Sequence, residues 1–262
     1  MSGPVAVGTE IDAGVATVTV DNPPVNALDD ETLAALGDAA TALAGREDVR
    51  CVVLTGAGEK AFLAGADLRS LQGALGTPGA MDAHVALTRP VFEAWRGLPQ
   101  PLVAAVAANA VGGGLEFALL ADLIVADPAA RFGVPEVTLG LIPGGGGTQR
   151  LPRRIGWTAA MEMLLTGRLV TAERAHELGI VNRLAAPGEA RAEAAKLAAK
   201  LAALPALAVQ AAKQAARGAL EEGLDAGLDR ERDLFLTVAA SADAREGAAA
   251  FLEKRPPSFR HR

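Results

Sequence analysis

The chain has 262 residues, one cysteine, three histidines and a formal net charge of −6 at pH 7. This length suffices for one large domain, and a single cysteine excludes an internal disulfide framework or a multi-cysteine zinc site. The acidic balance, without a basic stripe, argues against a general nucleic-acid binder.

The first half of the chain predicts alternating strands and helices. Val15–Val20 alternates and is β-branched, as in a half-buried strand, and Cys51–Leu54 is typical of a short buried strand. Between them, Asp29 and Asp30 precede apolar residues at helical spacing, which predicts a capped helix. Further along we expect a loop at about 70–80, helices at Met81–Arg96 and Leu115–Leu120, and strands at Leu102–Ala107, Asp122–Ala126 and Phe132–Val134.

The second half is mostly helical in pattern from Thr148 onward. Ile180–Val181 is the last predicted strand, and after Pro187 we expect helix to the end of the chain, interrupted at Pro205, 218–223 and Ser241. Alternating strands and helices followed by helices alone predict an α/β fold with a helical C-terminal region. A composition shift near residue 190 divides the chain into a predicted core, 1–190, and a helical region, 191–262.

No targeting or membrane segment is predicted. The N-terminal sequence MSGPVAVGTE has neither a basic region nor an apolar run. The uncharged stretch 98–115 contains Pro99, Pro101 and three consecutive glycines, which would expose backbone that lipid cannot satisfy. We therefore expect a cytoplasmic protein with no membrane contact.

Several well-known catalytic and nucleotide-binding motifs are missing. The sequence has no Gly-Lys pair for a P-loop and no G-x-S-x-G, and Gly144–Gly147 continues into Thr148-Gln149, which does not fit G-x-G-x-x-G. His176-Glu177 lacks the second histidine of a zinc protease motif. The absence of tyrosine removes tyrosine-based acid/base chemistry.

Three Gly-rich segments remain: Lys60–Asp67, Asn109–Glu116 and Val134–Arg150. Glycines let backbone N–H groups approach a ligand closely, and two facing turns could form an oxyanion hole. Glu116 follows one turn and Glu136 lies just beyond a short predicted strand, so the pair could perform acid/base work. The local pattern equally allows glycines that serve tight turns and glutamates that cap helices or pair at the surface.

The segments AFxAGAD, GGGxE and PExxLGxxPGxGGTQRL, in this order, resemble the crotonase (enoyl-CoA hydratase/isomerase) family. The resemblance runs from Asn26-Ala-Leu28 to the tail Phe251–Arg255. It implies an α/β spiral of ββα turns with a helical C-terminal trimerisation region, and a homotrimer or dimer of trimers. It also implies an acyl-CoA thioester as substrate, with no metal and no separate cofactor, because coenzyme A is part of the substrate.

The same resemblance assigns roles to individual residues. The backbone N–H groups of Ala64 and Gly113 would form the oxyanion hole, and Gly144 would help to hold a water. Glu116 and Glu136 fill both glutamate positions of the hydratases, which add water across the double bond of a trans-2-enoyl-CoA to give a 3-hydroxyacyl-CoA. Glu116 would deprotonate the water and Glu136 would supply the Cα proton, although the shared water leaves the division of labour open.

Three alternatives to hydration stay open. Family isomerases that move a 3-enoyl double bond typically keep only the second glutamate, so isomerisation is one alternative. A non-catalytic acyl-CoA-binding member and a purely structural oligomer are the others. The acyl tunnel would include part of Leu68–Val85, which has no motif, so chain length, substrate and pathway cannot be predicted.

Coenzyme A contacts are expected mainly from the first Gly-rich segment. Many family members carry a lysine near Asn26, where this chain has Pro23-Pro24-Val25, so phosphate contact from that loop is not expected. Arg69, beyond AGAD, and Lys254, in the tail, are the better candidates for phosphate contact, and Lys254 would act across a subunit boundary. The complete expected set comprises Val25, Ala64, Gly65, Ala66, Asp67, Leu68, Arg69, Gly113 and Lys254. Outside the site, we expect Cys51, Trp95 and Trp157 to pack in the interior, and His84 and His176 to lie on helix surfaces.

Overall fold

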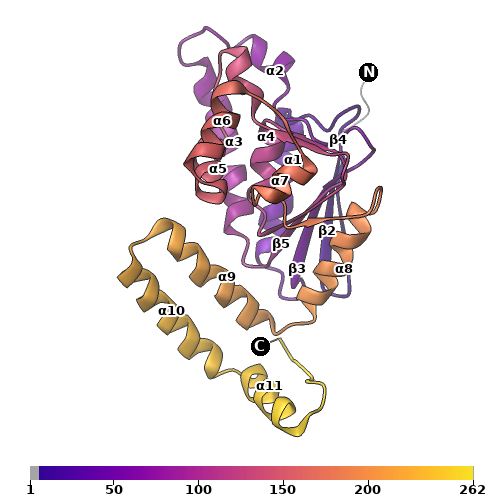
Figure 1. Cartoon of the computed structure of the whole chain (residues 1–262), viewed down its shortest axis with the longest axis vertical. Helices are drawn as coiled ribbons and strands as arrows, with labels where there is room; N and C mark the ends of the chain where they lie inside the picture. The colour runs from indigo at the N-terminus through magenta and orange to yellow at the C-terminus, as the bar shows by residue number, and fades with distance from the viewer. Residues whose placement is uncertain (1–5, 262) are drawn as a thin grey trace.

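Two sheets form the centre of the protein in the computed structural model, which describes residues 6–261 (Figure 1). The larger sheet has the order β1-β2-β3-β5-β7-β10 and the smaller has the order β4-β6-β8-β9. The larger sheet contains β1 (Ala6–Asp12), β2 (Val15–Asp21), β3 (Cys51–Gly56), β5 (Leu102–Val106), β7 (Leu123–Ala126) and β10 (Arg183–Leu184). The smaller contains β4 (Ala61–Leu63), β6 (Asn109–Val111), β8 (Arg131–Gly133) and β9 (Val170–Thr171).

The chain passes from one sheet to the other in a repeated pattern. Three times in succession, a strand of the larger sheet is followed by a strand of the smaller sheet and then by a helix: β3-β4-α2, β5-β6-α4 and β7-β8-α5, the last with a 3₁₀ turn before its helix. All pairings among β2, β3, β5, β7 and β10 are parallel, as are those among β4, β6 and β8. This arrangement confirms the predicted spiral of ββα turns.

The helices comprise α1 (Asp30–Ala44), α2 (Leu68–Gln72), α3 (Ala80–Gly97), α4 (Gly113–Ala118), the 3₁₀ helix η1 (Pro135–Leu139), α5 (Gly147–Ile155), α6 (Trp157–Thr166), α7 (Ala172–Glu177), α8 (Ala190–Ala202), α9 (Ala206–Glu221), α10 (Leu224–Ala239) and α11 (Ala242–Glu253). The predicted cap of α1 is confirmed, because the Asp29 side chain accepts the Thr32 N–H at 2.8 Å. Every residue of β3 and β5 is buried, as expected for parallel strands covered on both faces.

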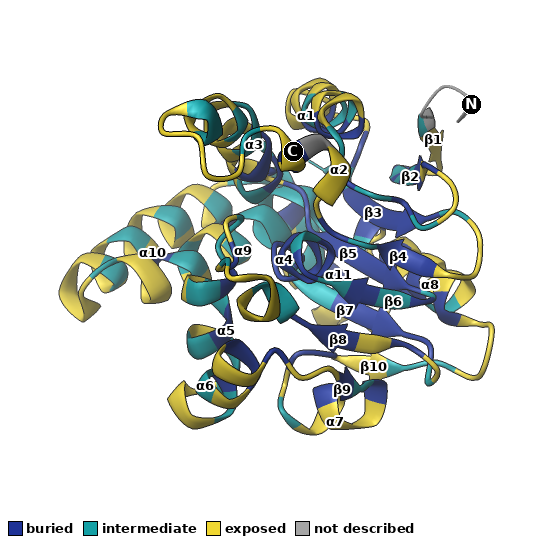
Figure 2. Cartoon of the chain, turned by 90° about the horizontal axis from the view of Figure 1, so that it is seen from above, coloured by how far each residue is buried: buried dark blue, intermediate teal, exposed yellow. Residues whose placement is uncertain are grey.

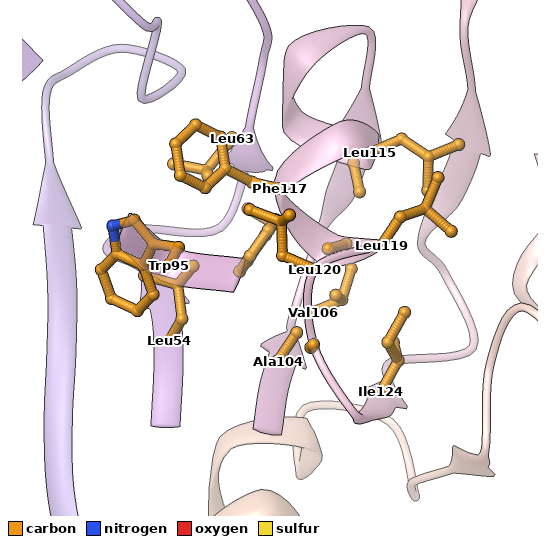
Figure 3. Close-up of a cluster of buried hydrophobic side chains, with 14 of the residues drawn as sticks. Leu54, Leu63, Trp95, Ala104, Val106, Leu115, Phe117, Leu119, Leu120 and Ile124 are labelled. Carbon is orange, nitrogen blue, oxygen red and sulfur yellow. The ribbon is translucent and has the colours of Figure 1, made fainter. Parts of the chain in front are cut away.

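The main core surrounds the short helix α4, as Figure 3 shows. Leu115 and Phe117 of α4 are fully buried beside Ile124 of β7. Trp95 of α3 is also buried, and its Nε1 donates to the carbonyl oxygen of Leu36 at 2.9 Å, so the ring and its polar atom are both accommodated. A smaller apolar cluster between the larger sheet and α8 includes Cys51 of β3 and residues of α8. The helix that carries Glu116 is therefore held by dense apolar packing.

Helices α9, α10 and α11 form a C-terminal arm that projects from this body (Figure 1), and Figure 2 shows α10 in the colours of exposed and intermediate residues. Within the described chain, α10 has no buried residue, and it exposes large apolar side chains, among them Leu224, Phe235 and Leu236. The arm is attached through α9, where Lys213 Nζ lies 2.6 Å from Asp122 Oδ2 and 2.6 Å from the carbonyl oxygen of Gln100. An apolar surface of this kind is typical of an oligomer interface.

The predicted division of the chain into a core, 1–190, and a helical region, 191–262, stays a prediction. Residues 1–5 of the predicted core lie outside the described range. In the structure, the change in packing comes after α8, because α8 still covers the larger sheet. No helix within residues 6–261 is both long and apolar enough to cross a membrane.

Two sequence predictions about apolar residues were wrong, one at Ile180–Val181 and one at Trp157. Ile180 and Val181 form no strand: both are buried, and their N–H groups donate to the carbonyl oxygen of Ala175 at 2.8 and 3.1 Å, which closes the end of α7. The strand begins at Arg183 instead and pairs with β7. Trp157 is 71% exposed at the start of α6 rather than packed.

Candidate active site

The first two Gly-rich turns lie against each other. A Cβ added to Gly65 would lie 3.0 Å from the carbonyl oxygen of Val111 and 3.1 Å from the nitrogen of Gly113. Gly65 also has a φ of +91°, a conformation that side chains rarely adopt. Glycine is therefore required there both for the backbone conformation and for the close approach of the second turn.

The two glutamates lie against the remaining glycines. A Cβ on Gly112 would lie 3.0 Å from Oε1 of Glu136, and a Cβ on Gly147 would lie 3.1 Å from Oε1 of Glu116. The three Gly-rich segments thus converge around two carboxyl groups. Within residues 6–261, no group of three or more His, Cys, Asp or Glu side chains is arranged to hold a metal ion.

Glu116 lies in the first turn of α4 and is only 3% exposed. Its Oε1 accepts the N–H of Gly147 at 2.7 Å. Burial raises the pKa of Glu116, and the N–H groups of Gly147, Gly145 and Gly146 oppose that rise, together with the positive charge of Arg150. The side chain is buried, but its ionised form has dedicated partners.

Glu136 lies at the start of η1, and its buried carboxyl oxygen lacks the hydrogen-bond partners that Glu116 has. Its Oε2 is buried and has no hydrogen-bond partner among the described residues. Burial raises the pKa of Glu136 to about 7, its own backbone N–H partly opposes this, and the charge of Glu116 adds to the rise. Two neighbouring carboxyl groups held in different environments can act as a base and an acid at one pH.

The predicted oxyanion donor Ala64 is not free in the structure. Its N–H donates to the carbonyl oxygen of Asn26 at 3.3 Å, which contradicts the expectation taken from the motif. Two residues further on, Ala66 forms an isolated parallel bridge with Leu28. In that bridge the Leu28 N–H donates to the carbonyl oxygen of Gly65, and the Asp67 N–H donates to the carbonyl oxygen of Leu28. Ala66 makes neither bond, so its N–H points away from Leu28.

The second expected donor, Gly113, fits the structure better. It is the first residue of α4, where an N–H has no partner within the helix. A Cβ on Gly113 would lie 3.7 Å from the nitrogen of Ala66. Ala66 and Gly113 therefore present adjacent backbone N–H groups that are available for a ligand within residues 6–261.

Asn26 supports this loop, a role that the sequence alone does not assign. It is buried at a φ of +56°, and its Nδ2 donates to the carbonyl oxygens of Ala57 and Ala61, each at 2.9 Å. Its Oδ1 accepts the N–H of Asn22 at 3.0 Å. Its backbone and side chain together tie the loop after β2 to β4, and the Asn-Ala-Leu motif was the signal available for it.

The expected coenzyme A residues fall into two separate groups. Ala66, Leu68 and Arg69 are exposed beside the site, and Asp67 caps α2 by accepting the Arg69 N–H at 2.9 Å. Lys254 instead ends α11 on the projecting arm (Figure 1). The same chain does not bring Lys254 to Arg69, so its expected contact needs a second copy.

Val25 is half-buried in its loop, and a Cβ on Gly144 would meet no heavy atom within 4 Å. Both residues are placed without strain, and neither has a contact that identifies a ligand. Their expected roles remain predictions.

Comparison with known proteins covers nearly the whole chain. The enoyl-CoA hydratase/isomerase family matches residues 10–262. A protein named probable enoyl-CoA hydratase from Rhizobium meliloti is 40% identical over 97% of both chains, and a crotonyl-CoA hydratase from Syntrophomonas wolfei is 38% identical over 94% of both. The crystal structure of enoyl-CoA hydratase subunit I from Geobacillus kaustophilus superposes with a TM-score of 0.91, at 40% identity over 99% of both chains.

Proposed function

The chain belongs to the enoyl-CoA hydratase/isomerase family, and we propose that it is a hydro-lyase that converts trans-2-enoyl-CoA thioesters to 3-hydroxyacyl-CoA. The observation that carries this proposal is the convergence of Glu116 and Glu136 in different electrostatic environments. Relatives named for enoyl-CoA hydratases and a crotonyl-CoA hydratase support the substrate class.

The thioester carbonyl oxygen would accept the N–H groups of Ala66 and Gly113. As water adds to Cβ, negative charge moves onto this oxygen in an enolate-like intermediate. Preorganised donors directed at a developing charge are each worth a few kcal/mol of transition-state stabilisation. Because both donors are backbone groups, removing a side chain would not delete them.

The two carboxyl groups would share the proton transfers. Glu116, ionised and held by backbone N–H groups, accepts a proton from the water whose oxygen bonds to Cβ, and the N–H of Gly144 helps to hold that water. Glu136, whose raised pKa favours the protonated form, donates a proton to Cα. The bound product thus gains one OH and one H, and a proton passes from Glu116 back to Glu136 before the next turnover. Two carboxyls, backbone donors and water complete the reaction, so no separate cofactor or metal enters.

Crotonyl-CoA tests the proposal directly, through the loss of its enoyl-thioester ultraviolet absorbance. We expect rapid loss with the wild type and a fall of roughly 10²- to 10⁴-fold in Glu116→Ala and in Glu136→Ala. Glu162→Ala, which removes an exposed carboxyl paired with Arg168, is the matched control. Binding of a coenzyme A ester without turnover would favour the non-catalytic alternative, and no binding would favour a structural oligomer.

Isomerisation of 3-enoyl-CoA is the alternative that the same variants separate. It needs only one carboxyl to move a proton between two carbons, so Glu116→Ala could spare it. The buried position of Glu116 and its three backbone partners favour hydration, since a dispensable carboxyl would not need them.

We further propose that the chain forms a homotrimer or a dimer of trimers through the projecting helices. The support is the exposed apolar surface of α10, including Phe235 and Leu236. Light scattering should give the mass of three or six chains, and Phe235→Asp should lower it; a monomeric wild type would refute the proposal. Assembly would also decide whether Lys254 joins Arg69 and Val25 at coenzyme A. A cytoplasmic location remains a prediction.

A further inference from the structure

Arg150 folds back over the turn that holds Glu116. It stands in the first turn of α5, and its Nη1 donates to the carbonyl oxygen of Gly145 at 2.5 Å. A Cβ on Gly146 would lie 2.0 Å from that Nη1, so the guanidinium fills the space that a side chain at position 146 would need. Gly146 also has a φ of +105°, and the arginine therefore packs on a turn that only glycine can form.

The bond from Arg150 orients one particular peptide plane. The carbonyl of Gly145 and the N–H of Gly146 belong to the same trans peptide and point in opposite directions. Holding the carbonyl toward Arg150 therefore directs the N–H to the opposite side. Glu116 lies there, since the N–H groups of Gly145 and Gly146 stabilise its carboxylate and the N–H of Gly147 donates to it at 2.7 Å.

The surroundings of Arg150 make it a fixed part of this turn. Phe92 of α3 closes the other side, because a Cβ on Gly145 would lie 2.4 Å from its Cζ. The charged groups facing Arg150 are Glu93 and Arg96 of α3 and Glu116 of α4. Glu116 is in turn faced by Arg150 and by Glu136. Because an arginine stays charged at every working pH, its effect on Glu116 is a constant one.

We propose that Arg150 is a positioning residue for hydration, which holds the Gly145–Gly147 turn so that its N–H groups keep the Glu116 carboxylate in place as the base. The inference rests on the proposed function. Within residues 6–261, the hydrogen bond and the charged neighbours of Arg150 do not include Ala66, Gly113 or Glu136. Its effect should therefore fall on turnover and on the pH at which Glu116 ionises, and not on substrate affinity.

The test compares Arg150→Met and Arg150→Lys with Arg153→Met, a control on the same helix whose exposed arginine bonds Gln149 of its own helix. With crotonyl-CoA, we expect Arg150→Met to lower kcat roughly ten- to hundredfold with KM little changed. The acidic limb of its kcat/KM profile should move to higher pH. Arg150→Lys keeps the charge, so it should retain the wild-type limb and recover part of kcat, and Arg153→Met should match the wild type.

A second measurement separates this inference from the proposed function. The ¹³C carboxyl resonance of Glu116, assigned by its loss in Glu116→Gln, should titrate at higher pH in Arg150→Met than in the wild type, whether or not crotonyl-CoA is turned over. Folded Arg150→Met with wild-type kcat, or with a lower kcat but an unmoved limb and an unmoved Glu116 titration, would overturn the inference. If Arg150→Met does not fold, a folded Arg150→Lys with full kcat would overturn it equally.

Discussion

Oε1 of Glu116 accepts the N–H of Gly147 at 2.7 Å, whereas the buried Oε2 of the neighbouring Glu136 has no hydrogen-bond partner among residues 6–261. The two carboxyl groups therefore differ in what happens when they ionise. A charge on Glu116 is met by backbone N–H groups, while a charge on Glu136 is both desolvated and repelled by Glu116. This asymmetry leads to the first two predictions.

The pH dependence of hydration should show an alkaline limb near neutrality. As the proposed acid, Glu136 would have to be protonated to donate to Cα, and burial raises its pKa to about 7. We expect kcat/KM for crotonyl-CoA to fall as pH rises through about 7, measured at constant ionic strength. A profile that stays level to pH 9 would contradict the assignment of Glu136 as the acid.

Glu136→Gln should stabilise the protein at high pH while removing its activity. Because the folded-state pKa lies above the ordinary value of 4.5, folding favours the neutral carboxyl, and that stabilisation is lost as pH rises from about 4.5 through about 7. An amide is neutral at every pH. We expect Tm at pH 8 to rise by roughly 2–4 °C, after discounting for solvent screening of a half-buried group, and to be unchanged at pH 4.

An equal gain in Tm at both pH values would point to packing rather than ionisation. The exposed carboxyl of Glu162 provides the comparison, because Glu162→Gln should give no gain at pH 8.

Gly145→Ala should damage catalysis far more than a typical glycine substitution. Its Cβ would lie 2.4 Å from Cζ of Phe92 and 2.9 Å from Oε2 of Glu116, so the turn must move away from the carboxylate. A shift of this size can cost roughly 10²-fold in kcat. Gly45→Ala is the control, since its φ is −93° and no heavy atom lies within 4 Å of the added carbon. Steady-state kinetics with kcat above half of the wild type would refute this reading.

The ion pair between Lys213 and Asp122 should anchor the C-terminal arm. Lys213→Met leaves the Asp122 carboxylate facing an apolar side chain on one side, with the more distant Arg217, 3.9 Å from Oδ1, still beside it. Removing one partner of a buried pair costs about 3–5 kcal/mol, and we expect the lower end here because Asp122 is partly exposed and keeps Arg217. Adding Asp122→Asn removes the carboxylate charge that has lost its nearest partner, and it keeps an acceptor for the Leu102 N–H, which Asp122 Oδ2 accepts at 2.7 Å. We expect the double variant to regain most of the loss in chemical denaturation at fixed protein concentration.

If Lys213→Met unfolds at the same denaturant concentration as the wild type, the pair contributes nothing to anchoring. If the double variant is less stable than the single one, the Asp122 carboxylate is not the cause of the loss.

Local signals in the sequence predicted most of the fold. The alternation of Val15–Val20 and the cap at Asp29 depend on neighbours in the chain, and both are confirmed. Ile180–Val181 failed because a buried apolar pair is compatible with a strand and equally with the closing turn of a helix. Trp157 failed because no local pattern separates an interior aromatic side chain from an exposed one.

The site was predictable as a set of segments but not as a set of atoms. The motifs predicted Glu116, Glu136 and Gly113 as site residues, which stay predictions, yet they could not say which alanine of the AGAD segment has an N–H that is not bonded to the Asn26 loop. That choice depends on the carbonyl of Asn26, which arrives from a distant loop and takes the N–H of Ala64. The role of Arg150 was hidden for a similar reason, because it follows from the direction of one peptide plane.

The positions of the two tryptophans determine how the protein can be observed. The chain has no tyrosine, so its intrinsic fluorescence comes essentially from Trp95 in the core and Trp157 at the surface. Unfolding would transfer only Trp95 from an apolar environment to water, and its emission would shift to longer wavelength. Trp157 is already hydrated in a single chain, so a shift of its emission to shorter wavelength would signal that something has covered α6. Trp157→Phe would leave Trp95 as the single tryptophan, so that the fluorescence would report on the core around α4 alone.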